Sequence, residues 1–248
     1  LDNLRINAVY QDELGDWSAL DFAGVESGGS LLAANAAVQK FVTDLQSKKI
    51  DTAVDKDKWD QLTMQTAQVN AFYNPQNNSI NIMAGILSGE IYNEDMNYEQ
   101  KLGGIGTVIG HEISHAFDTN GSQFDKDGAI SNWWTDEDYA AFQARAAKLA
   151  AWYDGFIPWE GAGYSGQQVQ TEAIADMGGM KCLLAIAAQQ ENFDYDAFFR
   201  QFATIWRMQG LPAYLVALVA QDTHPMRYLR INATLAQFDE FIEFYGIQ

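Results

Sequence analysis

Apolar and polar residues alternate with a period of two in a few short stretches near the start of the chain. Arg5–Tyr10 alternates in this way and predicts a strand. Two further runs, Val69–Tyr73 and Ser79–Met83, flank Asn74–Asn78, whose asparagines and proline favour a turn. These two runs predict a hairpin, so we expect a small sheet in the first third of the chain.

Most of the remaining chain places its apolar residues at helical spacing. Ser30 can cap a helix that continues to about Leu45, and Thr135 followed by Asp138 predicts a helix that ends near Tyr153. Further helices are expected over residues 103–117, 170–190, 194–209 and 211–221, and a last one from about 233, with Leu235, Phe238, Phe241 and Phe244 on one side. No linker rich in glycine, serine or proline divides the chain. The sequence therefore predicts a mainly α-helical protein with a small β-sheet, an α+β fold.

Two features of the predicted helix over residues 170–190 concern its packing. Gly178 and Gly179 lower helix propensity in its middle, which indicates that the backbone packs closely against a neighbouring element. Cys182 has mostly apolar neighbours, so we expect its thiol to be buried. Because Cys182 is the sole cysteine, an internal disulfide and a zinc site of several cysteines are excluded.

Length and charge narrow the class of protein. With 248 residues, 48% of them hydrophobic, the chain can bury a sizeable core, in one large domain or two packed lobes. A formal net charge of -18 opposes binding to nucleic acid phosphates. No apolar run approaches a bilayer span, and the first residues lack the features of a signal peptide. We expect no nucleic-acid partner, no membrane segment, and either a removed leader or a piece of a longer chain.

The strongest sign of chemistry is the run from His111 through Glu112 to His115, within the predicted helix 103–117. Positions four apart lie on one helix face, so the two imidazoles can bind one metal ion. Glu112 projects to the side, where its carboxylate can reach a metal-activated water rather than the metal. This is the H-E-x-x-H arrangement of zinc peptidases. The alternative is a helix that carries two ordinary histidines.

A catalytic zinc ion needs a third protein ligand and an open fourth position. A third histidine close by is excluded, because Asp118 and Gly121 stand where the extended motif has glycine and histidine. Glu172 and Asp176 share one face of the predicted helix 170–190, so one can bind the metal while the other orients a ligating histidine. Glu172 is the preferred ligand. The alternative is a pair of solvated acids near a helix start.

His224 is the last of three histidines. It precedes a proline, which favours extended backbone, so we expect it in a loop. Arg230 follows six residues later in the chain. A hydrolase that builds a tetrahedral oxyanion benefits from hydrogen-bond donors around it, and both side chains can supply them. The alternative is a loop histidine and an arginine at a helix start, neither with a role.

These residues belong to a pattern that extends over nearly the whole chain. Its segments are Asn70–Pro75, Ala84–Leu87, Gly104–Asp118, Glu172–Gly179 and His224–Asn232. In order and spacing the pattern resembles the neprilysin and endothelin-converting-enzyme family of zinc metallopeptidases, with its bacterial oligopeptidase members. The resemblance implies a thermolysin-like zincin (gluzincin) catalytic lobe that spans residues 1–248 and cleaves short peptides.

The resemblance also implies roles for individual residues. His111, His115 and Glu172 would hold one Zn²⁺, Glu112 would act as general base and later as acid, and Asp176 would orient His111. His224 would stabilise the oxyanion.

Substrate contacts are implied by the same resemblance. Arg230, Asn70 and the Ala71 carbonyl would hold the peptide backbone. An apolar pocket for the residue after the cut would be lined by Ile86, Val108, Ile205 and Trp206; the alternative for these four is ordinary core.

The chain also departs from the family pattern. Met83 stands where a proline is usual, and Gly89–Ile91 departs from a stretch usually rich in proline and aromatic residues. Both changes concern the shape of the pocket. The C-terminal cysteine of animal members is absent, which favours a bacterial member. Family members carry a large N-terminal helical lobe that is missing here, so that lobe is an expected partner.

The sequence thus predicts an endopeptidase that cuts short peptides before hydrophobic residues, using a metal-activated water. The alternative is an isolated or non-catalytic lobe that binds zinc and peptides and needs the missing N-terminal lobe for activity. By resemblance the protein would lie outside the cytoplasm (periplasmic, at the surface or secreted) or in the cytoplasm of a bacterium.

Overall fold

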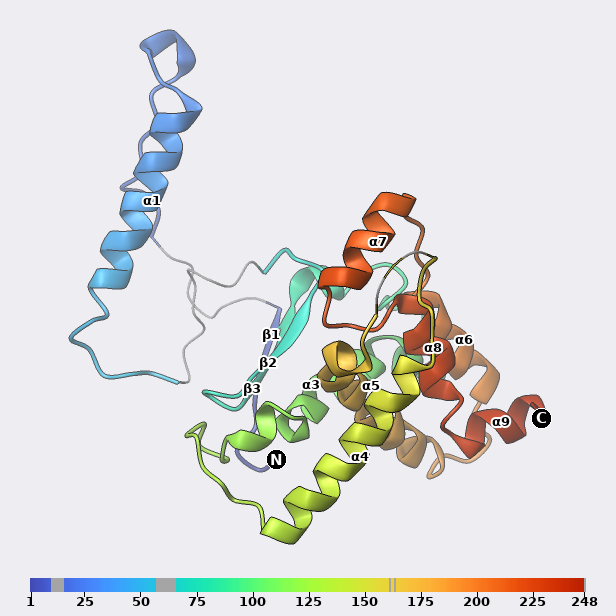
Figure 1. Cartoon of the computed structure of the whole chain (residues 1–248). Helices are drawn as coiled ribbons and strands as arrows, with labels where there is room; N and C mark the ends of the chain where they lie inside the picture. Colours follow the sequence, from blue (N-terminus) through green and yellow to red (C-terminus); the bar gives the residue numbers. More distant parts are fainter. Residues whose placement is uncertain (10–15, 57–65, 161, 163, 248) are drawn as a thin grey trace. The chain divides into compact units, whose positions relative to one another are not determined.

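The computed structural model describes residues 1–9, 16–56, 66–160, 162 and 164–247 (Figure 1). The chain forms two compact units, one of Leu1–Val9 with Ala67–Gln248 and the other of Tyr10–Thr66. Within the described residues, no helix combines the length and the apolar character that a membrane span requires.

The larger unit contains a three-stranded sheet in the order β1 (Arg5–Val9), β3 (Ser79–Met83), β2 (Ala71–Asn74). β3 pairs with β2 in antiparallel and with β1 in parallel orientation. The predicted hairpin is therefore confirmed, and the first strand is confirmed as far as Val9, because Tyr10 lies outside the described residues. All five residues of β3 are buried, whereas β2 is left as an edge strand.

Helices make up most of the larger unit in its described part. They are α2 (Tyr98–Lys101), α3 (Thr107–Ser114), α4 (Asp136–Asp154), α5 (Gly166–Ala187), α6 (Tyr195–Ile205), α7 (Pro212–Gln221), α8 (Arg227–Leu235) and α9 (Asp239–Tyr245). A π-helical turn at Leu102–Gly106 leads into α3, and short 3₁₀ turns follow α3 at His115–Phe117 and Gly121–Gln123. As predicted, the fold is mainly helical with a small sheet.

α3 and α5 meet at their glycines. A Cβ atom added to Gly179 would lie 2.7 Å from the backbone nitrogen of His111, and one added to Gly110 would lie 3.1 Å from the Cα of Gly179. The close packing predicted for the Gly178-Gly179 pair is therefore confirmed. This contact brings the backbone of α5 against the part of α3 that carries the histidines, and α4 packs along α5 as well (Figure 1).

Three predictions about the helices were wrong. The single C-terminal helix expected from about Ala233 is two helices, α8 and α9. Between them the backbone of Phe238 is extended, and this allows the side chains of Leu235 and Phe238 to pack in the same buried cluster. α6 ends at Ile205 rather than near residue 209. Cys182 is exposed, because it lies on the solvent side of α5 while the next two leucines are buried.

The smaller unit contains α1 (Leu31–Ser47). As predicted, Ser30 caps this helix, and its hydroxyl accepts a hydrogen bond from the Ala33 nitrogen at 3.1 Å. No residue of α1 is buried. The connection expected over Ile50–Lys58 is exposed as far as residue 56, and its last two residues lie outside the described part.

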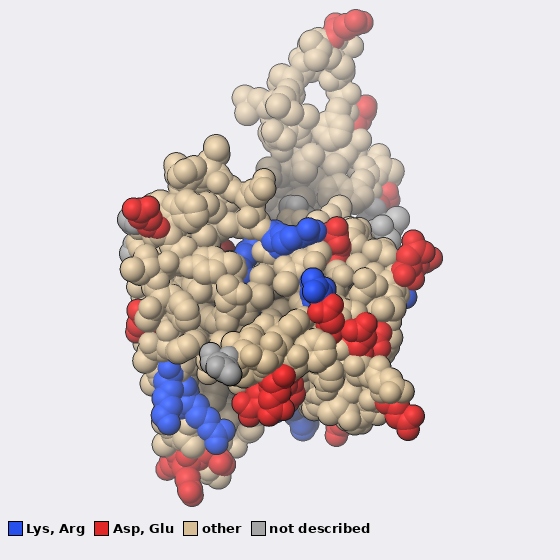
Figure 2. Space-filling view, turned by 90° about the vertical axis from the view of Figure 1, so that its right-hand side faces the viewer, with Lys and Arg blue, Asp and Glu red and all other residues tan. Residues whose placement is uncertain are grey.

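The formal charge of -18 is visible on the molecular surface. On the described part of the face in Figure 2, acidic side chains are scattered over the surface and its edges, and basic side chains gather in only a few places. That face offers no broad basic surface for a phosphate backbone.

Candidate metal centre and active site

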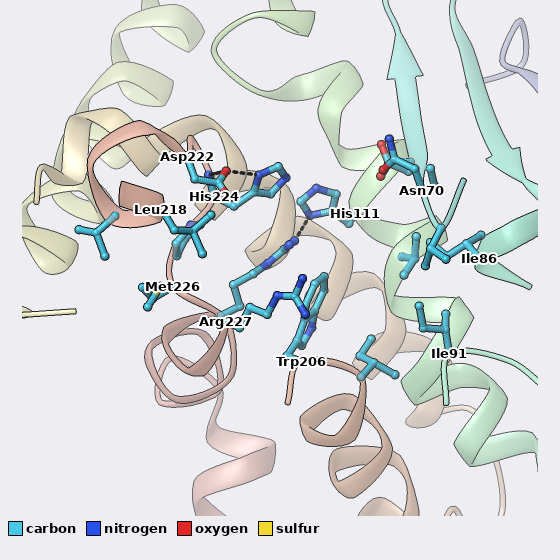
Figure 3. Close-up of a pocket in the computed structure, with 18 of the residues that line it drawn as sticks. Asn70, Ile86, Ile91, His111, Trp206, Leu218, Asp222, His224, Met226 and Arg227 are labelled. Carbon is cyan, nitrogen blue, oxygen red and sulfur yellow. Dashed lines mark hydrogen bonds and ion pairs between the residues drawn. The ribbon is translucent and has the colours of Figure 1, made fainter. Parts of the chain in front are cut away.

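A cavity of about 360 Å³ opens between two hydrophobic clusters of the larger unit. One cluster contains Ile86 and Val108, and the other contains Val219 and Met226. Figure 3 shows Asn70, Ile86 and Ile91 on one side of this pocket and Leu218, Asp222, His224 and Met226 on the other, with His111 and Trp206 between them. The pocket thus has an apolar wall and a wall that carries polar groups.

The two predicted histidine ligands and the predicted glutamate meet beside this pocket. His111 lies on α3, His115 opens the 3₁₀ turn after it, and Glu172 lies on α5. The Nε2 atoms of the two histidines are 3.0 Å apart. The Oε2 atom of Glu172 lies 3.2 Å from His111 Nε2 and 3.4 Å from His115 Nε2.

These residues fit a zinc ion. Their donor atoms all lie within 4.8 Å of one another, and two histidines with one glutamate form a known catalytic zinc set. Glu172 Oε2 is buried and has no hydrogen-bond partner among the described residues. The imidazole nitrogens of His111 and His115 lie near this oxygen but do not hydrogen-bond to it. A cation shared by the three side chains would supply the missing partner.

A carboxylate lies beside the Nδ1 atom of each of the two predicted histidine ligands. His111 Nδ1 lies 2.7 Å from Asp176 Oδ1, as predicted. His115 Nδ1 lies 2.5 Å from Asp118 Oδ2, an interaction that the sequence analysis missed. The other oxygen of Asp118 accepts hydrogen bonds from the backbone nitrogens of Asn120 and Gly121 at 2.7 Å. Its position three residues after a ligating histidine was the available signal.

The charges around the ligands shift their protonation. Burial opposes a charged imidazole, but the neighbouring carboxylates of Asp118 and Glu172 raise the pKa of His115 to about 10. Burial also opposes a charged Glu172, yet the three imidazoles around it hold the pKa of its carboxyl below the ordinary range. Without a metal, the positive charge of the imidazoles and the negative charge of the carboxylates therefore stabilise each other.

Glu112 is buried beside the two histidines. Burial raises the pKa of its carboxyl above the ordinary value, although the neighbouring imidazoles lower it in part. A carboxylate whose pKa is moved toward neutrality is better suited to accept a proton from water.

Arg230 is buried and is fixed on two sides. Its Nε and Nη2 atoms donate to Asp176 at 2.9 and 2.6 Å, and its guanidinium lies over the Trp206 ring, 3.8 Å from the centroid. Burial opposes a charged Asp176, but the positive charge of Arg230 holds the pKa of its carboxyl below the ordinary range. Arg230 also lines the pocket, so its guanidinium is within reach of a bound ligand.

His224 lies in a loop, as expected, and points toward the predicted ligands. Its Nε2 atom is 3.1 Å from Glu172 Oε2. Asp222, which the sequence analysis also missed, accepts hydrogen bonds from the His224 backbone nitrogen at 2.9 Å and from Nδ1 at 2.8 Å (Figure 3). The tertiary structure therefore brings His224 into the candidate site.

The remaining predicted site residues also line the pocket. They are Asn70, Ala71, Ile86, Val108, Ile205 and Trp206. Asn70 O accepts a hydrogen bond from Met83 N. Neighbouring residues of a strand point their backbone N–H and C=O groups to opposite edges. The N–H and C=O of Ala71 therefore point away from β3, toward the other edge of β2. Ile86 and Val108 belong to a hydrophobic cluster as well, so they serve the core and the pocket together.

Comparisons with known proteins show which sequences this chain is similar to. Residues 70–248 match the family described as peptidase family M13. The chain is 38% identical over 222 residues to a neutral endopeptidase of Lactococcus lactis subsp. lactis. The aligned region makes up 90% of this chain and 35% of that protein. It is 33% identical over 217 residues to the human endothelin-converting enzyme-like 1, covering 82% of this chain and 27% of that protein.

Solved structures show the same fold. PepO from Lactobacillus rhamnosis superposes with a TM-score of 0.87 at 30% identity, covering 100% of this chain and 38% of that one. The zinc metalloprotease Zmp1 of Mycobacterium tuberculosis, solved with an inhibitor, superposes with a TM-score of 0.83 at 28% identity. The superposition covers 100% of this chain and 39% of Zmp1. The chain thus spans little more than a third of the length of these relatives.

Proposed function

Because this chain belongs to peptidase family M13, we propose that it is a zinc endopeptidase that cleaves bonds within short peptides. The observation that carries the proposal is the convergence of His111, His115 and Glu172, with donor atoms within 4.8 Å of one another. Three protein ligands are the number that a catalytic zinc ion uses, since a fourth position stays open. A bound zinc ion supplies a Lewis acid that lowers the pKa of water toward about 7.

Acid–base chemistry falls to Glu112. Its buried carboxylate, beside both histidines, takes a proton from the attacking water and later delivers a proton to the leaving amine. Asp176 and Asp118 keep the two ligating imidazoles in one orientation and one tautomer through their Nδ1 atoms.

Charge stabilisation falls to the opposite wall of the pocket. His224, oriented by Asp222, donates to the oxygen that becomes negative as the carbonyl is attacked. Arg230 binds the backbone of the peptide, while Asp176 and Trp206 hold the guanidinium still. Asn70 and the Ala71 carbonyl hold the peptide as an added strand along β2, whose edge is open.

The apolar wall sets the preference for the residue after the cut. Ile86, Val108, Ile205 and Trp206 line the cavity next to His111 and Glu112, so a hydrophobic side chain gains there by leaving water. A peptide library that varies this position tests the assignment. We expect hydrophobic residues to be preferred; a preference for charged residues would contradict it.

The decisive test is hydrolysis of a quenched hydrophobic peptide by zinc-loaded protein. A chelated sample and the Glu112→Gln variant serve as controls. Activity that is lost in both controls supports the proposal.

The length of the relatives favours a second candidate function. The Lactococcus protein is covered for only 35% of its length by this chain. Closure of further chain over a site excludes water and completes many active sites. A lobe that binds zinc and peptides without turnover, and gains activity when the remaining part of a longer relative is added, supports this second function instead.

A further inference from the structure

A second cavity adjoins the active-site pocket. It has a volume of about 1010 Å³ and lies in the larger unit. Much of its lining is apolar and includes Ile157, Trp159 and Leu215. Three residues line both cavities, namely Trp206, Met226 and Arg227. A peptide that leaves the active-site pocket past Trp206 would therefore meet Arg227 and then the second cavity.

Arg227 lies one helical turn away from a residue of the proposed active site. It is the first residue of α8, and Arg230 follows three positions later on the same helix face. Positions three apart bring their Cβ atoms within roughly 5–6 Å. Arg230 reaches His111, with 3.2 Å between its Nη2 atom and His111 Nδ1. In Figure 3 the side chain of Arg227 extends from the side of Met226 toward Trp206. The two arginines thus follow the pocket wall outward from the predicted metal ligands.

Three arginines of the described residues line the two cavities, and two of them are paired. Arg230 lies 2.6 Å from Asp176. Arg207, in the second cavity, lies 3.4 Å from Glu90. Arg227 is exposed, and its guanidinium forms no hydrogen bond or ion pair with a described residue. The helix gains nothing from this charge either, since the helix dipole disfavours a cation in the first turn.

A carboxylate is the partner that fits Arg227. The guanidinium presents a planar fork of N–H donors that matches the two oxygens of a carboxylate. Acidic residues outnumber basic ones by 33 to 15 in this chain, yet none of the described acids pairs with Arg227. Glu160, an exposed acid that lines the second cavity, is among those that do not. Water can solvate an exposed guanidinium, so its place between two cavities weighs more than the missing partner.

We propose that Arg227 determines specificity by binding a carboxylate carried by the second residue after the cut. This inference rests on the proposed peptidase function. The residue directly after the cut would occupy the apolar wall that includes Trp206, and the next residue continues toward Arg227. The carboxylate is either the C-terminus of a peptide that ends there or the side chain of an aspartate or glutamate. Because Arg227 would touch the substrate away from the reacting atoms, the contact favours binding rather than the chemical step.

Two pairs of peptides test the proposal and distinguish the two sources of the carboxylate. One pair ends at the second residue after the cut, with a free carboxylate or an amide. The other pair is longer and amidated, with glutamate or glutamine at that position. We expect the wild type to favour the carboxylate in at least one pair, by about two- to fivefold in kcat/KM, as for a solvent-exposed ion pair. The pair that shows the preference identifies the source.

Variants at this position separate recognition from a structural role. Arg227→Gln should abolish the preference, Arg227→Lys should retain part of it, and Arg227→Glu should reverse it, with the change in KM rather than in kcat. A structural role would instead lower activity on every peptide alike. Arg145→Gln is the matched control, because Arg145 is exposed on α4 and lines neither cavity. A preference that survives in Arg227→Gln, or that falls as far in Arg145→Gln, would overturn the inference.

The two proposals can fail separately. Phosphonopeptides with the same two pairs of groups at the second position measure binding to the zinc-loaded chain without turnover. A chain that binds them but cleaves nothing contradicts the endopeptidase function, and the affinity ratios still decide on Arg227. A chain that cleaves peptides with no preference for a carboxylate contradicts the role of Arg227 alone. If the zinc-loaded chain neither binds nor cleaves any of these peptides, both proposals fail.

Discussion

At the scale of single residues, the site separates ligands from the groups that hold them. His111, His115 and Glu172 converge through their outer atoms. Asp176 and Asp118 fix the rings from behind. Of these five residues, Glu172 and Asp176 lie on α5, His111 lies on α3, and His115 and Asp118 lie in and just after the 3₁₀ turn that follows α3.

Glu112→Gln is expected to retain zinc and lose turnover. The amide is close in size to the carboxylate but cannot take a proton, so kcat should fall by about 10²- to 10⁴-fold. Zinc content by atomic absorption and hydrolysis of the quenched peptide measure the two effects. Substantial turnover by this variant would contradict the role of Glu112 as general base.

Asp118→Asn is expected to weaken zinc binding by about 10- to 100-fold, because the side chain behind His115 loses its charge. Competition against a chelator of known affinity measures the change. Asp95→Asn, at an exposed acid remote in sequence from the ligands, is the control. Equal zinc affinity in the two variants would show that Asp118 does not support the metal site.

At the scale of elements, the approach of α3 to α5 positions the chemistry. Gly110 and Gly179 allow the two backbones to touch, and this contact places Glu172 opposite His111. The H-E-x-x-H pattern specifies one helix face, but the distance to the third ligand is decided by this packing.

Gly179→Ala is therefore expected to destabilise the protein and weaken zinc binding. Its Cβ would lie 2.7 Å from the His111 nitrogen, and both atoms belong to helices that cannot give way without separating. Overpacking of this kind costs about 1–3 kcal/mol, which lowers Tm by several degrees. Gly24→Ala is the control, because its Cβ would meet nothing within 4 Å. If the two variants had the same Tm, the close packing of α3 and α5 would make no contribution to stability.

At the scale of the whole molecule, the chain consists of two compact units, and the three proposed metal ligands lie in one of them. A zinc ion bound by these residues would therefore stabilise the larger unit directly. The smaller unit, with α1 and no buried residue in it, has no ligand in the cluster of His111, His115 and Glu172.

Zinc is expected to raise the Tm of the larger unit and to slow hydrogen exchange in α3 and α5, but not in α1. At a free zinc concentration 100-fold above Kd, the gain is about 2.7 kcal/mol. Thermal melting with and without chelator, followed by hydrogen exchange, measures both. The His115→Ala variant should show neither the rise in Tm nor the slower hydrogen exchange when zinc is added. If zinc protected α1 as strongly as α5, the expectation that it stabilises only the larger unit would be wrong.

Much of the site follows from the sequence alone, because its signals are local. The spacing of His111 and His115 determines a shared helix face, and the same holds for Glu172 and Asp176. Local chemistry also predicted the hairpin, the Ser30 cap and the close packing at Gly179. The family pattern then assigned roles to residues that spacing left open, such as His224 and Arg230.

Other features were decided by the tertiary structure, because they depend on contacts between distant segments. The break between α8 and α9 follows from the burial of Phe238 in a cluster that α6 and α5 help to build. Exposure of Cys182 follows from which side of α5 the neighbours cover. The burial of Tyr164 depends on a hydrophobic cluster that includes Val169, Leu215 and Leu229, which lie on three different helices. Helix periodicity determines which residues share a face, whereas burial and hydrogen-bond partners are determined by what packs against that face.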